Sequence, residues 1–433
     1  MSQGSAVERL YALVAHEKGV RACTDLSEQA CRDVPGNFFR LAGALVLTKM
    51  ADLLINPKTV LAWLMTAVGA PAALVAWLVP VRESGALIPQ LVIGAWMRRH
   101  PRRKPFWVLG SILQGLCVLA MAAAIGWLEG KAAGLAIIAL LVAFSLSRGL
   151  CSVAVKDVEG KTIPRTRRGR LSGLATTLSG VGTLVLTLAL FAGQRDPSFA
   201  FYLGLLISAA VLWWLAAALF SRIGEEAGAT GGGGNTLRQA LGHLRLLRDD
   251  PPFRHFVITR ALLMASALGA PFLVILAQNG GGGWLLGGFV LASALASTVS
   301  AGFWGWMADT SSRRVMLRAG TMAALICLTG GGLALTGLEG RALDWLYPGL
   351  YFVLAIAHDG VRIGRNTYLV DMAAENRRTD YTAVSNTVIG VLLLVVGGVS
   401  ALAATASPET ALVLLGLMGT GGALSAWRLA EVQ

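Results

Sequence analysis

Long apolar runs recur along the whole chain and constrain its fold more than any other feature. Each run is long enough to cross a hydrocarbon layer about 30 Å thick as a helix. The runs are continuous in Leu, Ala, Val and Gly, whereas the strands of a membrane barrel would alternate apolar and polar residues. We therefore expect an all-α polytopic membrane protein with twelve transmembrane helices, near residues 41–67, 73–97, 106–128, 133–155, 172–193, 199–220, 254–278, 284–307, 314–337, 345–367, 382–406 and 410–430.

The composition agrees with a membrane environment. Charged residues make up 14% of the chain and hydrophobic residues 55%, while a soluble domain has roughly 25% charged residues. The 52 glycines suit closely packed membrane helices. Residues 1–40 have no convincing signal peptide, because their short apolar piece is followed at once by charged residues. We expect this segment to lie in the cytoplasm.

The net charge is +13, and the basic residues behind it alternate between the connections of the expected helices. Every second connection between the expected helices is rich in Lys and Arg: residues 98–104, 157–171, 222–253, 313–314 and 377–378. The intervening connections have at most one basic residue each, Lys131, Arg195 or Arg341. The positive-inside rule then places both termini in the cytoplasm and the protein in a bacterial inner membrane. The basic residues face lipid headgroups in this interpretation, and no nucleic acid is expected as a partner.

Short sequence matches indicate an internal repeat. VLTK at 46–49 matches VITR at 257–260, and Gly94 matches Gly305, both at a separation of 211 residues. Arg167–Arg168 matches Arg377–Arg378 at a separation of 210. We therefore expect two six-helix pseudo-repeats, at 41–221 and 254–433, joined by a cytoplasmic linker at 222–253. Such repeats are typical of transporters in which two halves rock against each other.

The stretch GWMADTSSRRVML at 305–317 resembles the signature that joins the second and third helices of each half in the major facilitator superfamily. Gly305, Asp309, Arg313 and Arg314 are in register with that signature, while Met307, Thr310 and Ser312 depart from it. The first-half copy at 94–104 keeps Gly94, Arg102 and Arg103 but has Arg98 in place of the acid.

The resemblance implies a twelve-helix transporter fold in which this loop is a cytoplasmic gate. In such a gate the glycine would allow close helix contact and the acid would pair with the next helix. A simpler alternative is a basic turn that only sets topology. The resemblance also implies that the first, fourth, seventh and tenth helices line a central cavity.

Ionisable side chains inside the expected spans are the candidate site. Each costs about 2.5–3.5 kcal/mol to insert near mid-membrane unless it faces a cavity or a partner. The candidates are Lys49, Asp52, Asn56, Lys58, Arg82, Glu83, Arg148, Arg260, His358, Asp359, Arg362 and Arg365. We expect Lys49, Asp52 and Asn56 to share one helix face, and Lys49, Asp52, Arg82 and Glu83 to form a charge network. Asp359 and Arg362 could instead be a structural i, i+3 pair.

Basic side chains outnumber acidic ones among these candidates, which favours an anionic or zwitterionic small solute. The expected function is secondary transport by alternating access, as a monomer, with proton coupling through Asp52 or Glu83. Two alternatives stay open: a lipid or lysolipid transporter of the same fold, and a membrane assembly factor that does not transport. No phosphate-binding loop or metal-ligand spacing is present, so we expect no enzyme activity, cofactor or metal.

Overall fold

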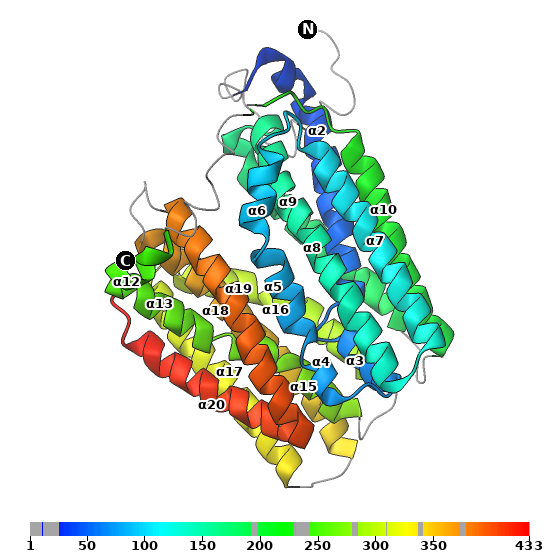
Figure 1. The fold of residues 1–433 in the computed structure, drawn as a ribbon, viewed down its shortest axis with the longest axis vertical. Coiled ribbons are helices and arrows are strands. Elements are labelled where there is room, and N and C mark those ends of the chain that lie inside the picture. The colour runs from blue at the N-terminus through cyan, green and yellow to red at the C-terminus, as the bar shows by residue number, and fades with distance from the viewer. Residues whose placement is uncertain are drawn as a thin grey trace.

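The structure is a computed structural model that describes Tyr11 and residues 26–191, 198–228, 230, 243–278, 285–308, 310–336, 341–372 and 378–432. These residues form helices and short connections, without strands. They form two bundles, which lie side by side (Figure 1). The helices of the first bundle are α2 Glu28–Leu54, α3 Val60–Ala67, α4 Ala72–Val75, α5 Leu78–Leu87, α6 Gln90–Met97, α7 Lys104–Trp127, α8 Gly130–Thr162, α9 Arg165–Phe191 and α10 Phe199–Ser221.

The second bundle follows the linker. It begins with two short elements, η2 His243–Arg245 and α12 Leu246–Asp249. Its longer helices are α13 Pro251–Leu262, α15 Ala270–Gln278, α16 Leu285–Ala308, α17 Ser312–Leu335, α18 Arg341–Met372, α19 Arg378–Ala406 and α20 Pro408–Trp427, with α14 Ala265–Leu268 between the first two.

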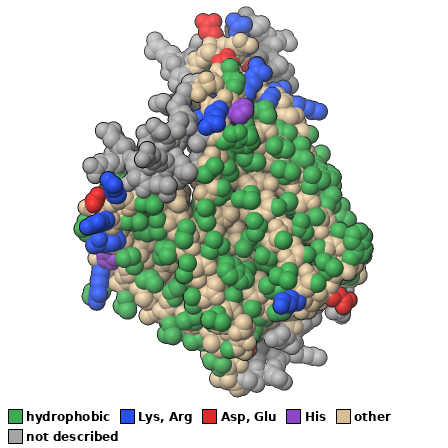
Figure 2. Space-filling model, viewed as in Figure 1, with side chains coloured by type: hydrophobic (Ala, Val, Ile, Leu, Met, Phe, Trp, Pro, Cys, Tyr) green, Lys and Arg blue, Asp and Glu red, His purple; other side chains and the backbone are tan. Residues whose placement is uncertain are grey.

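The expected membrane class is confirmed by the helices themselves. Among the residues that the structure describes, ten segments are long and apolar enough to cross a membrane. The two other expected spans, 41–67 and 345–367, are also helical and lie in α2–α3 and α18. Figure 2 shows apolar side chains over most of the visible surface. Trp427 and Leu402 are among the large apolar residues that are exposed, which is the arrangement expected where lipid replaces water.

The first expected span is not one continuous helix. Helix α2 ends at Leu54 and α3 begins at Val60, because Pro57 has no N–H to continue the hydrogen-bond ladder. Asn56 therefore does not share a face of α2 with Lys49 and Asp52, and that expectation is wrong. Its side-chain oxygen instead accepts a hydrogen bond from the backbone N–H of Lys58 at 2.9 Å.

The second and seventh spans are interrupted as well. Pro89 separates α5 from α6, and the second span has a further interruption between α4 and α5. In the seventh span, Gly269 separates α14 from α15, two residues before Pro271. Each interruption leaves backbone groups outside the regular ladder, a feature found in membrane proteins where helices line a cavity.

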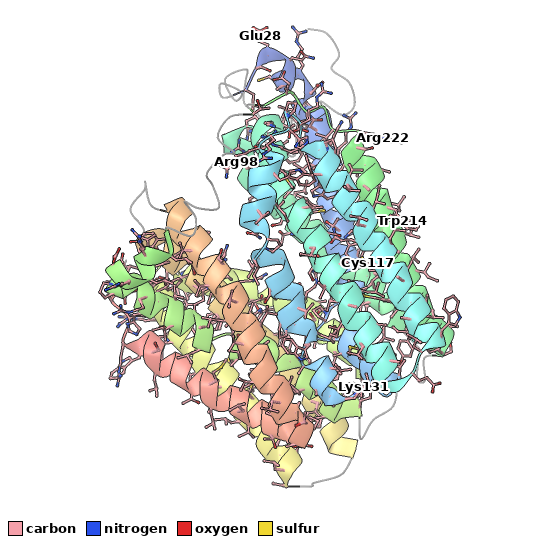
Figure 3. The ribbon with its side chains drawn as sticks, viewed as in Figure 1. Glu28, Arg98, Cys117, Lys131, Trp214 and Arg222 are labelled. Carbon is pink, nitrogen blue, oxygen red and sulfur yellow. The ribbon has the colours of Figure 1, made fainter. Side chains whose placement is uncertain are left out.

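Basic residues mark one end of the molecule. Figure 3 labels Arg98 and Arg222 near one end of the first bundle and Lys131 near the other. The connections that lead into α7 and out of α10 meet at the first of these ends, where Lys104 Nζ donates to the carbonyl of Ile223 at 2.8 Å. We call this the basic end.

The two bundles contact each other mainly away from the basic end. There, α3, α4 and α5 pack against α14, α15, α16 and α19, and a lateral contact joins α9 to α16. The segments that continue toward the basic end stay within their own bundle, since α6 packs on α8, and α13 packs on α12, α19 and α20. The bundles therefore diverge toward the basic end, as Figure 1 shows.

Candidate functional site

A cavity of about 540 Å³ lies between the two bundles. Its wall includes residues from α5, α8, α13, α16, α18 and α19 and from the break between α2 and α3. Many of the expected site residues meet there: Asn56, Lys58, Glu83, Arg148, Arg260, His358, Asp359, Arg362 and Arg365. Asn56 and Lys58 reach this wall from the break before α3, and not from the continuous helix that was expected at 41–67.

Helix α18 contributes an internal ion pair to the cavity. Arg362 Nη2 lies 2.8 Å from Asp359 Oδ1 on the preceding turn, so the i, i+3 pair considered from the sequence is present. The Asp359 side chain is mostly buried, whereas 54% of the Arg362 side chain is exposed. His358 lies beside them, with Nδ1 3.1 Å from the Ser266 hydroxyl. A solute in the cavity could therefore reach Arg362 without breaking the pair.

Arg260 is held by neutral partners only. Its Nη1 donates to Ser385 Oγ at 2.6 Å and its Nη2 donates to Asn386 Oδ1 at 3.0 Å. Both partners lie on α19, and no carboxylate pairs with Arg260 among the described residues. The Nε atoms of Arg260 and Arg365 are buried without an acceptor, so hydrogen-bond donors of the second bundle remain available beside the cavity.

Asp52 is the centre of a second cluster, inside the first bundle. Arg82 Nη2 lies 2.6 Å from Asp52 Oδ1, and Arg148 Nη1 lies 2.5 Å from Asp52 Oδ2. The Arg82 guanidinium also lies 4.6 Å above the ring of Phe144, in cation–π range. One carboxylate thus holds two arginines from two other helices.

The expected network of four residues is therefore only partly correct. Arg82 pairs with Asp52 and not with Glu83. Lys49 Nζ donates to Thr176 Oγ1 on α9 at 2.8 Å. Lys49 and Asp52 border a smaller cavity of about 220 Å³ within the first bundle, which Arg148 also borders. Glu83 is exposed in the larger cavity and has no ion pair with any residue that the structure describes.

The second-half gate motif, at 305–314, contacts the segment that follows α20. Arg313 Nε lies 3.1 Å from Glu431 Oε2, and the Ser311 hydroxyl donates to Glu431 Oε1 at 2.8 Å. Arg314 is exposed, and Asp309 lies outside the described residues. A Cβ at Gly305 would meet nothing within 4 Å. Close helix contact is therefore not the reason for a glycine at this position.

The first-half copy is attached in a related way. Glu225, whose side chain is fully buried, accepts hydrogen bonds from the backbone N–H groups of Arg103 and Lys104 at 2.8 and 2.7 Å. It also lies 3.1 Å from Lys161 Nζ. Arg103 Nε lies 3.4 Å from Asp157, and Arg102 is exposed.

The two attachments follow the internal repeat. Glu225 follows the last helix of the first bundle, which ends at Ser221, and Glu431 follows the last helix of the second, which ends at Trp427. In each case the glutamate binds the start of the third helix of its bundle. Both residues were missed from the sequence because they lie outside the expected spans, and their equal spacing appears only from the observed helix ends. Glu225 is therefore the counterpart of Glu431, and the position of Arg98 has no acid of its own.

Gly94 in the first half does not make a close contact either. The nearest side-chain atom to a Cβ there would be Cγ1 of Val153, at 3.9 Å, which is an ordinary van der Waals distance. The glycine rationale drawn from the gate signature is therefore wrong for both copies.

Comparisons with known proteins agree with this architecture. The family model described as Major Facilitator Superfamily matches residues 41–397. A crystal structure of a D-xylose–proton symporter superposes with a TM-score of 0.68 at 12% identity, covering 91% of this chain and 98% of that one. The nucleoside transporter NupG gives a TM-score of 0.70 at 11% identity, with coverages of 90% and 99%.

A third structure, of a POT family transporter in complex with a thioalcohol-conjugated peptide, gives a TM-score of 0.67 at 13% identity, with coverages of 89% and 94%. No curated protein matches the sequence significantly. At these identities the likeness concerns the fold, and the solute has to be inferred from this chain's own cavity.

Proposed function

Because the chain belongs to the major facilitator superfamily, we propose that it is a secondary transporter for a small anionic or zwitterionic solute. The observation that carries this proposal is the cavity wall, where Lys58, Arg260 and Arg365 have no carboxylate partner among the described residues. Cations held in a site of low dielectric attract an anion strongly. Alternating access requires only that the bundles reorient around the bound solute, without covalent chemistry.

A thermal-shift screen of the purified protein tests the solute class. We expect organic anions or amino acids to raise the unfolding temperature, because a ligand that binds the folded state stabilises it. Neutral sugars should not. Stabilisation by lysolipids alone would support the lipid-transporter alternative. A protein that no solute stabilises, and that moves none in proteoliposomes, would instead fit an assembly factor built on this fold.

For orientation in the membrane, we propose that the basic end faces the cytoplasm. The supporting observation is that Arg98 and Arg222, from two of the connections rich in Lys and Arg, lie at that end, whereas Lys131 lies at the other. The state described here would then be closed toward the outside, since the bundles contact each other away from the basic end. Both termini would lie on the cytoplasmic side of a bacterial inner membrane, and the protein would be a monomer.

Cysteine labelling of whole cells checks this orientation. In a variant without native cysteines, Lys131→Cys and Thr336→Cys should react with an impermeant thiol reagent added outside. Arg102→Cys and Ser221→Cys should react only after the membrane is opened. All four positions are exposed, so burial does not limit their reactivity. Labelling of Ser221→Cys in intact cells would reverse the proposed orientation.

For proton coupling, we propose Glu83 as the proton carrier. Asp52 is already engaged by two guanidinium groups. Glu83 faces the cavity without such a partner in the described part of the chain. A proton on Glu83 removes a negative charge from the site, so an anion should bind more tightly as the pH falls.

Substitution of Glu83 by glutamine tests this role. Binding linked to one proton changes by up to about tenfold per pH unit, and Glu83→Gln should remove that dependence while keeping affinity at low pH. The measurement is solute affinity of the wild type and the variant between pH 5 and 8. A variant with the same pH dependence as the wild type would exclude Glu83 as the carrier.

A further inference from the structure

The charged groups around the cavity divide into paired and unpaired sets. Asp52 pairs with Arg82 and Arg148, and Asp359 pairs with Arg362. Within the described residues, three cations lack a carboxylate, namely Lys58, Arg260 and Arg365. One carboxylate, Glu83, lacks a cation partner. The unpaired set thus has two more positive than negative charges.

The unpaired cations come from both bundles. Lys58 lies in the break between α2 and α3 of the first bundle, while Arg260 on α13 and Arg365 on α18 belong to the second. Arg365 lies close enough to Lys58 and to Arg260 to repel both, while Glu83 attracts Lys58 and Arg365. Removing such charges from water costs several kcal/mol per ion unless opposite charge compensates them.

We propose that the solute is doubly negative, with its charge shared between Lys58 of the first bundle and Arg260 and Arg365 of the second. This inference rests on the proposed function and makes it more specific. A dianion neutralises the unpaired set while Glu83 is ionised. A dicarboxylate or a phosphate monoester meets the requirement, because both present two negative charges to guanidinium and ammonium donors.

The number of negative charges on the solute also affects how the two bundles approach each other. A monoanion leaves one positive charge of the unpaired set uncompensated. A dianion contacts both bundles at once, so it binds more tightly to a state in which the two walls approach each other. A ligand with such a preference shifts the population toward the closed state.

Matched ligand pairs test the proposal on the purified full-length protein. The first pairs are succinate with its monoamide and glutarate with its monoamide, and the second is methyl phosphate with dimethyl phosphate. Each pair differs by one negative charge and little in size. We expect at least one dianion to bind about tenfold more tightly than its singly charged partner, a difference of about 1.4 kcal/mol. The pair that shows it distinguishes carboxylate from phosphate recognition.

Two variants test whether Lys58 is responsible for the preference for the dianion. Lys58→Gln should reduce the preference for the dianion to less than about threefold while the monoanion still binds. Lys131→Gln, exposed at the far end of the first bundle, should retain the full preference. Size-exclusion chromatography confirms that each variant is folded.

The outcomes separate this inference from the proposed function. Equal affinity for both members of every pair would overturn the dianion while leaving an anion transporter. An unchanged preference in Lys58→Gln would overturn the bridging role of Lys58. Binding of neutral solutes but of no anion would contradict the proposed function itself.

Discussion

Asp52→Ala is expected to abolish most of the folded protein. The substitution removes the carboxylate that holds Arg82 and Arg148, at 2.6 and 2.5 Å. Only 7% of the Arg82 side chain is exposed, so water cannot replace the lost partner. Breaking a buried pair by removing one member typically costs about 3–5 kcal/mol, which is a large part of the stability of a typical domain. Membrane yield and thermal unfolding in detergent measure the loss.

Two further variants identify the cause. Arg82→Leu combined with Asp52→Ala should recover part of the lost yield, since it removes the most deeply buried of the uncompensated charges. Glu83→Ala serves as the matched control, because Glu83 neighbours Arg82 on α5 but has no ion pair within the described residues. If Glu83→Ala lowers the yield as much as Asp52→Ala does, the Asp52 cluster is not what stabilises this bundle.

Gly397→Val is expected to open the contact between the bundles. Helix α19 lies so close to α5 at this point that a Cβ on residue 397 would be 2.3 Å from Cγ of Pro80. The proline ring is rigid and cannot move aside as a flexible side chain would. One turn along the same contact, the Ser84 hydroxyl donates to the carbonyl of Gly390 at 2.7 Å. A larger residue at 397 therefore forces the two bundles apart without disturbing the interior of either.

The expected result is a shift toward the conformation open away from the basic end. Overpacking costs about 1–3 kcal/mol, which changes the ratio of the two conformations by about 5- to 150-fold. Distances between spin labels on the two bundles, measured in the wild type and the variant, report the shift. Gly398→Ala is the control, since a Cβ there would be 3.5 Å from the nearest atom of Trp77, an ordinary contact. Unchanged distances in Gly397→Val would show that this contact does not hold the conformation.

The apolar runs predicted the positions and order of the helical spans because insertion of a helix into lipid depends on local composition. Charges inside those runs predicted the position of the cavity for the same reason, since an ionised group in a span needs a polar surrounding. Lys58, Arg260 and Arg365 all lie in the cavity wall. These properties belong to single segments and can be read without knowledge of packing.

Pairing within the site could not be predicted in the same way. Arg82 and Glu83 are neighbours in sequence, yet the partner of Arg82 is Asp52, 30 residues away. Long side chains reach across helix contacts, so the partner depends on how α2, α5 and α8 are rotated against one another. Asn56 was misplaced for a different reason, because Pro57 ends the helical periodicity on which the prediction relied. Glu225 was missed because it lies in a connection, outside every span.

The interrupted helices differ mechanically from the continuous ones. Helices α8 and α18 are continuous over 33 and 32 residues, although α18 contains Pro348. The first, second and seventh spans contain joints, near Pro57, Pro89 and Gly269. A segment beyond a joint can tilt while the rest of its span stays in place. The two ends of the pathway can therefore move independently, and a state closed at both ends needs no bending of an intact helix.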